Sequence, residues 1–214
     1  MAFKLPKEPI RNRKEFVTYL LATACGVGLA LGLERAAEWW KTRTLVAEAR
    51  HNLATELGET KKRVAAWRAK SPVMLKNFAE VSDYTEEMLA KSVSNRSSLA
   101  LSFEIAHLNS AAWKAAEATG ASGHMDYDEV KRYAEVYGMQ HEFERVQSVL
   151  LDESAPLMGF FSKGTDPTKN QPRSEMEVLG RGVRTLAIRL KTLDSLGNAT
   201  EELCERALRA EAKK

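Results

Sequence analysis

Apolar residues along this chain recur at intervals of three and four, and no run alternates apolar and polar residues between hairpin turns. This pattern is typical of amphipathic helices, so we expect an all-α fold. The first helix is expected to cross a membrane, continue as a long helix, and pack with about four further helices in an antiparallel bundle. The expected helices cover residues 16–70, 72–92, 98–119 and 126–154, followed by one that starts at Ser174.

Proline, glycine and capping residues set the expected helix ends. Ser71 followed by Pro72 is typical of an N-cap and a first helical position, which predicts a break between the first two helices. Gly120 is expected to end the third helix, and the capping-box sequence over 126–129 to begin the fourth. The range 156–173 is expected to form one long loop. Its apolar residues are expected to cover an end of the bundle rather than contact lipid or a partner: Leu157, Met158, Phe160 and Phe161.

The clearest apolar seam lies in the last expected helix and predicts burial against neighbouring helices, as in coiled coils. Its members alternate in steps of three and four: Met176, Leu179, Val183, Leu186, Leu190 and Leu193. The fourth helix has a shorter seam of the same kind: Met139, Phe143, Val146 and Leu150. The third has one apolar face: Leu101, Ile105, Leu108 and Ala112.

An uncharged stretch over residues 16–33 follows an arm that carries five lysine and arginine residues. As a helix it rises about 27 Å at about 1.5 Å per residue, close to the thickness of the hydrocarbon core of a bilayer. Arg13 and Lys14 precede the stretch, and Trp39 and Trp40 follow it. Basic and tryptophan side chains favour the membrane interface, so we expect a single transmembrane helix with these four residues at its boundaries.

The expected organisation therefore has three parts: a basic arm over residues 1–15, a transmembrane helix and its interface over 16–40, and a helical bundle domain over 41–214. Five basic residues precede the span and three lie in the ten residues after it. This difference predicts a cytoplasmic N-terminus and a helical domain on the outer side of the membrane. Two other interpretations stay open: a cleaved signal peptide, and a lipid anchor at Cys25, whose preceding residues resemble a lipobox.

Small residues on one face of the expected span predict helix association. Gly28 and Gly32 form a GxxxG pair, which allows two helices to approach closely. The same face continues beyond the membrane through Trp39, Val46 and Leu53, which are spaced by seven. We therefore expect a homodimer through the first helix. The stripe can equally pack on the bundle of its own chain.

Net charge and cysteine positions argue against a nucleic-acid-binding protein and against a disulfide. The chain holds 32 lysine and arginine residues against 29 aspartate and glutamate residues, a net charge of +3. This is too small for a basic field directed at nucleic acid. The two cysteines, Cys25 and Cys204, lie too far apart in the expected organisation to form a disulfide, and Cys204 is expected to be a small core residue.

Two Glu-x-x-His pairs are the one motif that resembles a catalytic centre: Glu48 with His51, and Glu104 with His107. Such pairs on facing helices, with further glutamates, hold two metal ions in some four-helix bundles. The first pair, however, points away from the stripe of Val46 on a helical projection, so it is expected to face water. We therefore expect no metal site and no other cofactor.

An apolar helix that ends in tryptophans is followed by a charged helix with the LxxEL sequence at 53–57. In these motifs the chain resembles a group of uncharacterised bacterial single-span membrane proteins with a helical soluble domain. A second match lies in the middle of the chain and consists of Ser110-Ala111-Ala112-Trp113, then Gly120, Tyr133 and Tyr137.

The resemblance implies a bacterial protein in the inner membrane with one span. It carries no known activity, so it transfers no functional residues. Trp113 and Tyr137 are expected to anchor the core where the third and fourth expected helices meet.

These features together predict a membrane-anchored helical scaffold, sensor or partner-binding protein without catalysis. Its expected partners are the lipid bilayer, a second copy of the chain and an unknown protein. A bundle that senses a small ligand in an apolar pocket is the alternative. A di-metal enzyme that uses the two glutamate–histidine pairs is the third reading.

Overall fold

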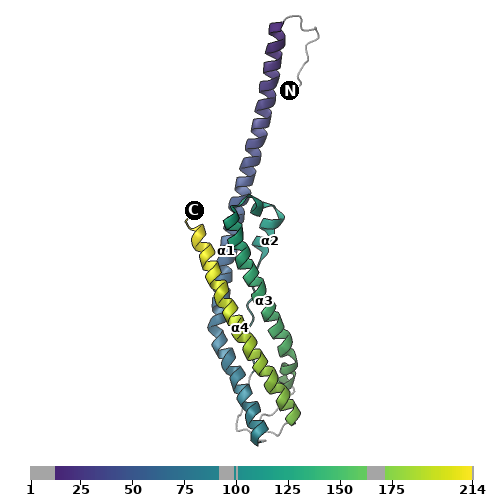
Figure 1. Cartoon of the computed structure of the whole chain (residues 1–214), viewed down its shortest axis with the longest axis vertical. Coiled ribbons are helices and arrows are strands. Elements are labelled where there is room, and N and C mark those ends of the chain that lie inside the picture. Colours follow the sequence, from purple (N-terminus) through teal and green to yellow (C-terminus); the bar gives the residue numbers. More distant parts are fainter. Residues whose placement is uncertain (1–12, 92–98, 100, 163–171, 214) are drawn as a thin grey trace. The chain divides into compact units, whose positions relative to one another are not determined.

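The computed structural model describes residues 13–91, 99, 101–162 and 172–213 (Figure 1). Its regular elements are all helical: α1 (Arg13–Lys91), α2 (Ala111–Ala118), the 3-10 helix η1 (Ala121–His124), α3 (Tyr127–Ser162) and α4 (Arg173–Glu211). The all-α prediction is confirmed. The chain divides into two compact units, residues 1–48 and 49–214, so α1 contributes to both. The expected domain boundary lay earlier, at residue 40.

The described part of the first unit is the N-terminal portion of α1. Every described side chain from Phe16 to Leu33 is exposed. This window is long and apolar enough to cross a membrane, and none of it is buried against other residues. Water-soluble proteins rarely expose so large a continuous apolar surface. The helix therefore contains one candidate membrane span near the N-terminus.

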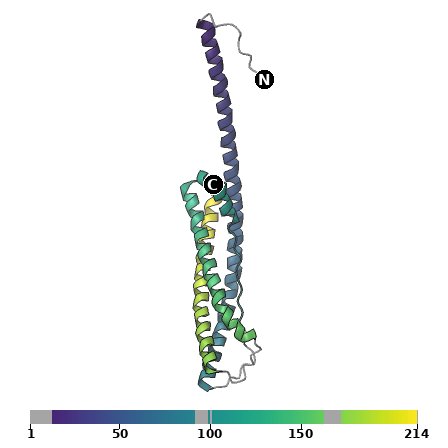
Figure 2. The ribbon, with the colours of Figure 1, turned by 90° about the vertical axis from the view of Figure 1, so that its right-hand side faces the viewer.

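The second unit is a bundle in which the C-terminal portion of α1 lies alongside α3 and α4 (Figures 1 and 2). Residues that join α1 to α3 occur in the same order along both helices. Tyr137 bonds to Glu56, and further on Phe143 packs edge-on against Trp67 with ring centroids 5.3 Å apart. These two helices therefore run parallel.

Helix α4 runs antiparallel to α1, because its later residues meet the earlier residues of α1. Three ion pairs show this order: Lys61 with Glu205, Arg68 with Glu201, and Glu86 with Arg184. The extended segment, defined here as residues 101–110, runs back along the bundle and allows α1 and α3 to be parallel.

The core follows the expected seams. All six seam residues of α4 from Met176 to Leu193 are at most 2% exposed, so that prediction is confirmed. In α1 the buried positions keep the same three-four spacing from Leu53 through Trp67 and Phe78 to Met88. Three facing seams of this kind fill the interior of the second unit together with Leu101 and Ala106, which lie outside the helices.

The predicted break at Pro72 is wrong, because α1 continues through this proline to Lys91. A proline inside a helix removes one main-chain hydrogen bond and costs about 3 kcal/mol. Here Met74 and Phe78 continue the buried seam in register, so packing outweighs the local penalty. Ser71 does not serve as a cap; its hydroxyl donates to Asp194 Oδ1 on α4 at 2.8 Å.

The prediction of a third helix over residues 98–119 is also wrong for most of that range. Residues 101–110 are not helical, and only the short α2 follows at Ala111. The spacing of Leu101, Ile105 and Leu108 fits a helix, but Ile105 is 36% exposed while Leu101 is buried. Side chains of α1 and α3 bind the main chain of this segment, which replaces the hydrogen bonds of a helix.

The start of α3 agrees with the expectation and its end does not. The helix begins at Tyr127, directly after a 3-10 turn whose preceding residue Gly120 has φ of 76°, a conformation that favours glycine. It continues through Pro156 to Ser162, so the expected loop begins later, and residues 163–171 lie outside the described residues. Leu157 is buried in the core, and Phe160 and Phe161 pack against the core as predicted, but Met158 is 40% exposed, contrary to the prediction.

Candidate functional site

The residues expected at the membrane interface lie on the N-terminal portion of α1. Lys14 is exposed, and Trp39 and Trp40 are 58% and 67% exposed. The two indole rings lie 6.4 Å apart, and the guanidinium of Arg43 sits 5.2 Å from the centre of the Trp39 ring. Arg13 begins α1. These placements are compatible with an interface role, which stays a prediction.

The expected association stripe divides into two parts with different surroundings. Gly28 and Gly32 have open space around them, and Trp39 is largely exposed. Val46 is 6% exposed, and Leu53 is fully buried in the core of the second unit. Leu53 is therefore occupied by packing within its own chain. A contact with a second copy can use only the glycines and the tryptophan.

The glutamate–histidine pairs do not form a common centre. Glu48 and His51 are exposed, as expected from their position on the helix. Glu104 and His107 lie on the extended segment rather than on a helix, and Glu104 forms an ion pair with Lys70. Within the described ranges, no group of three or more His, Cys, Asp or Glu side chains could hold a metal ion.

Two polar clusters lie inside the second unit, where α3 begins. The guanidinium of Arg50 donates two hydrogen bonds to Glu129, at 2.7 and 2.8 Å. Burial raises the pKa of Tyr133, whose hydroxyl lies 3.5 Å from the carboxylate of Glu211. These groups join α1, α3 and the end of α4 by charge-assisted contacts.

The second cluster is built around the buried carboxylate of Glu56. Tyr137 donates to Glu56 Oε1 at 2.7 Å, and the main-chain N–H of Ala112 donates to Oε2 at 3.0 Å. The second bond satisfies one of the free N–H groups at the start of α2. Trp113 stacks on Tyr137 with ring centroids 5.5 Å apart, so the expected anchor between these two parts of the chain is confirmed.

The extended segment is held by side chains that bind its main chain. From α1, Trp67 Nε1 donates to the carbonyl oxygen of Glu104 at 2.8 Å, and Arg63 Nη1 donates to that of His107 at 2.9 Å. The N–H of Glu104 donates to the Met74 sulfur at 3.2 Å.

From α3, Gln147 binds both main-chain groups of one residue. The N–H of Ala106 donates to Gln147 Oε1 at 2.7 Å, and Gln147 Nε2 donates to the carbonyl oxygen of Ala106 at 3.1 Å. Gln140, seven residues earlier, donates through Nε2 to the carbonyl oxygen of Asn109 at 3.0 Å. We call the five side chains that bind this main chain the segment-binding face: Arg63, Trp67, Met74, Gln140 and Gln147.

Sequence analysis missed the segment-binding face, although a signal was present. Gln140 and Gln147 lie among the buried apolar positions of α3 and are 1% and 8% exposed. Met139, which was assigned to the seam, is only half-buried. A polar amide at a seam position requires a hydrogen-bond partner. Two glutamines spaced by one heptad therefore pointed to a polar partner on that side of the helix.

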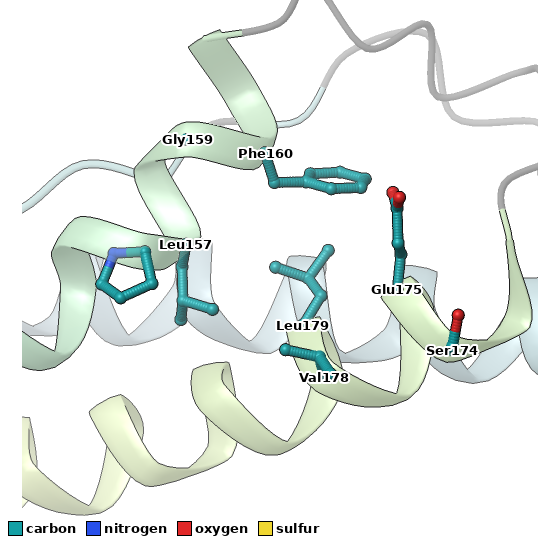
Figure 3. A pocket seen from close by; sticks show the side chains of 8 residues that line it. Leu157, Gly159, Phe160, Ser174, Glu175, Val178 and Leu179 are labelled. Atoms are coloured by element: carbon teal, nitrogen blue, oxygen red, sulfur yellow. The ribbon is translucent and has the colours of Figure 1, made fainter.

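A pocket of about 360 Å³ lies where the end of α3 meets the start of α4 (Figure 3). Leu157 and Phe160 of α3 face Val178 and Leu179 of α4 across it, and the carboxylate of Glu175 lies at its edge beside the Phe160 ring. Small-molecule sites are mostly apolar with a few polar groups, and this lining has that character.

The chain matches no family model, no curated protein and no solved structure in the comparisons made. The resemblance to bacterial single-span proteins therefore stays a prediction from short motifs.

Proposed function

We propose that this chain is a membrane-anchored helical scaffold whose second unit binds another protein. The observation that carries the proposal is the exposed apolar window over residues 16–33, which follows a basic arm. The cost of leaving these side chains in water is removed when a bilayer surrounds them. The exposed pair Trp39 and Trp40 lies beyond the window, where an interface is expected.

The proposed location is the inner membrane of a bacterium, with the arm in the cytoplasm and the second unit outside it. The excess of lysine and arginine before the span supports this orientation. A second copy of the chain is a proposed partner through Gly28 and Gly32, whose surroundings are open.

A binding role for the second unit is supported by how its buried polar groups are used. The carboxylates of Glu56 and Glu129 accept hydrogen bonds from Tyr137, Ala112 and Arg50, which hold elements of the bundle together. Rigid helices joined in this way present a fixed surface to a partner at little entropic cost.

Membrane fractionation of three forms tests the anchor. The wild type and a Leu21→Ile/Leu29→Ile control should stay with membranes after an alkaline carbonate wash. A Leu21→Arg/Leu29→Arg variant should be released, because a charge near the bilayer centre costs about 2.5–3.5 kcal/mol. Release of the wild type, or retention of the arginine variant, would contradict the anchor.

Two measurements address the remaining parts of the proposal. The intact mass of the membrane-bound chain distinguishes an uncleaved span from a cleaved leader or a lipid on Cys25. A periplasmic reporter fused after Lys214 should be active, and a reporter that works only in the cytoplasm should be silent. The opposite result would reverse the orientation.

The pocket between α3 and α4 favours a second candidate function, in which the bundle senses a small apolar ligand. An environment-sensitive apolar dye should then fluoresce with the wild type and lose that signal in a Val178→Trp variant, which fills the pocket. A Val73→Trp variant is the control, since Val73 is exposed on α1 and does not line the pocket. Equal dye signals in all three forms would exclude this function.

A further inference from the structure

We propose that the segment-binding face is a receptor for an extended polypeptide segment of a partner protein, and that the chain's own residues 101–109 occupy it until the partner segment displaces them. This inference rests on the proposed function for the existence of a protein partner and names the chemistry that the partner presents. The extended segment can be followed along the bundle in Figure 2.

The contacts that hold the segment are directed mainly at its main chain. Four hydrogen bonds from Arg63, Trp67, Gln140 and Gln147 end on carbonyl oxygens, and two N–H groups of the segment donate to side chains of the face. Every polypeptide in the same conformation offers these groups. The face therefore recognises extended main chain, with side chains contributing only where they are buried.

The distance between the two glutamines along α3 is close to the distance between their two partners along the extended segment. Seven residues of helix separate Gln140 from Gln147, which corresponds to about 10.5 Å along α3. Three residues separate their partners Ala106 and Asn109, which corresponds to about 10 Å of extended chain. The two amide side chains therefore lie opposite two residues of the segment that are three positions apart.

Within the described part of the chain, both polar atoms of the Gln147 amide have a hydrogen-bond partner, whereas only the Nε2 atom of the Gln140 amide has one. Gln140 Nε2 donates to Asn109, but its buried Oε1 has no hydrogen-bond partner among the described residues. A reversed amide would place Oε1 against the carboxylate of Glu144, 3.5 Å from the present Nε2, so the orientation is set by its neighbours. An unpaired buried acceptor costs about 1–3 kcal/mol.

This free acceptor distinguishes a partner segment from a second copy. After Asn109 the chain turns into α2 at Ala111, and an identical segment from a second copy would turn at the same place. A foreign segment that stays extended can offer a further N–H to Gln140 and bind it as Ala106 binds Gln147. A small residue is required opposite Gln147, because Ala106 is 6% exposed.

The segment contributes only a small part of the core of the second unit. It lies at the surface, where Glu104, Ile105 and His107 are exposed, and it contributes the buried side chains of Leu101 and Ala106. Leu101 and Ala106 belong to the same core cluster as the seams of α1, α3 and α4. A displacing segment must therefore replace the main-chain hydrogen bonds and also fill the space of these two side chains.

Binding of a labelled peptide to the full chain in detergent tests the proposal by fluorescence anisotropy. The probe is a synthetic peptide with the sequence of residues 101–112, and the control peptide carries Ala106→Pro, which cannot donate to Gln147. The probe should bind and the control should not. A chain with Ala106→Pro should bind the probe at least tenfold more tightly than the wild type, because its own segment competes less. Adding Gln147→Leu to that chain should abolish binding.

A cysteine pair provides a second test that leaves the segment-binding face unchanged. Asn77 Nδ2 lies 3.2 Å from Ser102 Oγ, so Asn77→Cys/Ser102→Cys in a Cys25→Ser background should tether the segment on oxidation. The oxidised chain should bind the probe at least tenfold more weakly than the reduced chain. Equal binding by both forms, or no binding by the reduced form and the Ala106→Pro chain, would overturn the proposal. Neither outcome affects the fractionation result, so failure of this inference is distinguishable from failure of the anchor.

Discussion

Arg50 of α1 and Glu129 of α3 form a two-bond ion pair in which the glutamate side chain is 1% exposed and the arginine side chain 30% exposed. Carboxylate and guanidinium match in geometry, and the pair fixes the first turn of α3 against α1. Burying a carboxylate without a partner costs free energy of folding, so the residue types at both positions matter for stability.

Replacement of Arg50 by methionine should destabilise the second unit by about 2–3 kcal/mol. This lies below the range of about 3–5 kcal/mol for a fully buried pair, because the arginine is partly in contact with water. A double variant, Arg50→Met/Glu129→Leu, should recover most of the loss since no charge remains buried. Urea unfolding of the three forms measures both effects. A double variant less stable than either single variant would contradict the pair as the cause.

Truncation of the α4 seam should be far more damaging than truncation of His51, a member of one Glu-x-x-His pair. Leu186 is fully buried, so Leu186→Ala should cost about 2–5 kcal/mol. His51 is exposed, and His51→Ala should change stability by less than about 0.5 kcal/mol. Thermal unfolding followed by circular dichroism compares them. Equal losses of stability in the two variants would show that His51 stabilises the fold although its side chain is exposed.

Replacement of helical glycines by alanine should stabilise the second unit at some positions and destabilise it at others. A Cβ at Gly58 of α1 or Gly138 of α3 would meet nothing within 4 Å, so alanine should stabilise each helix by about 0.5–1 kcal/mol. A Cβ at Gly180 of α4 would lie 2.8 Å from the hydroxyl oxygen of the fully buried Thr85, so Gly180→Ala should be destabilising by about 1–3 kcal/mol. Chemical denaturation of the three variants should order them in this way. A stabilising Gly180→Ala would show that Thr85 can move aside.

The free energy of unfolding should fall as the pH rises above about 9. Burial raises the pKa of Cys204 to about 12 and raises the pKa of Tyr137, which also donates to Glu56. Above the unfolded pKa values of about 8.5 for cysteine and about 10 for tyrosine, the unfolded chain releases protons that the folded chain keeps. The folded state therefore loses stability with increasing pH.

Urea titrations between pH 8 and 11 measure this dependence. A Cys204→Ala variant should retain a flat profile up to about pH 9, above which tyrosines with an unfolded pKa of about 10 begin to ionise. Iodoacetamide provides a second measurement, since Cys204 is buried and should be labelled only when the chain unfolds. Rapid labelling in the folded state would contradict the burial of this thiol.

Association through the first helix should depend on its glycines. Replacing both Gly28 and Gly32 by leucine keeps the span apolar but prevents close approach of two backbones. Oxidative cross-linking through Cys25 in membranes should therefore decrease relative to the wild type, and a Val27→Leu variant serves as a control. Equal cross-linking in all forms, or none in the wild type, would exclude the glycine face as the contact.

Much of the helical framework is predictable from local pattern. The α4 seam from Met176 to Leu193 is buried as expected, because an apolar stripe with three-four spacing can leave water only against another helix. The exposed window over 16–33 was likewise evident from length and composition alone. These features depend on residues close in sequence, so the sequence reports them directly.

The sequence predictions are wrong where contacts with distant parts of the chain stabilise a conformation that the local sequence disfavours. Pro72 is a strong helix breaker, yet the buried seam continues across it, and contacts with α4 hold the helix together. In the same way Leu101, Ile105 and Leu108 have helical spacing, but Trp67 and Gln147 satisfy the main chain in an extended form.

The sequence by itself determined the helical class, the candidate span and the seam of α4. Only the tertiary structure decided that α1 and α3 are parallel, and that an extended segment with its segment-binding face joins them. The physical reason is that a main-chain N–H or C=O group can pair with any suitable hydrogen-bond partner. The choice between a helical partner and the side chain of a residue 41 positions away is settled when the whole fold assembles.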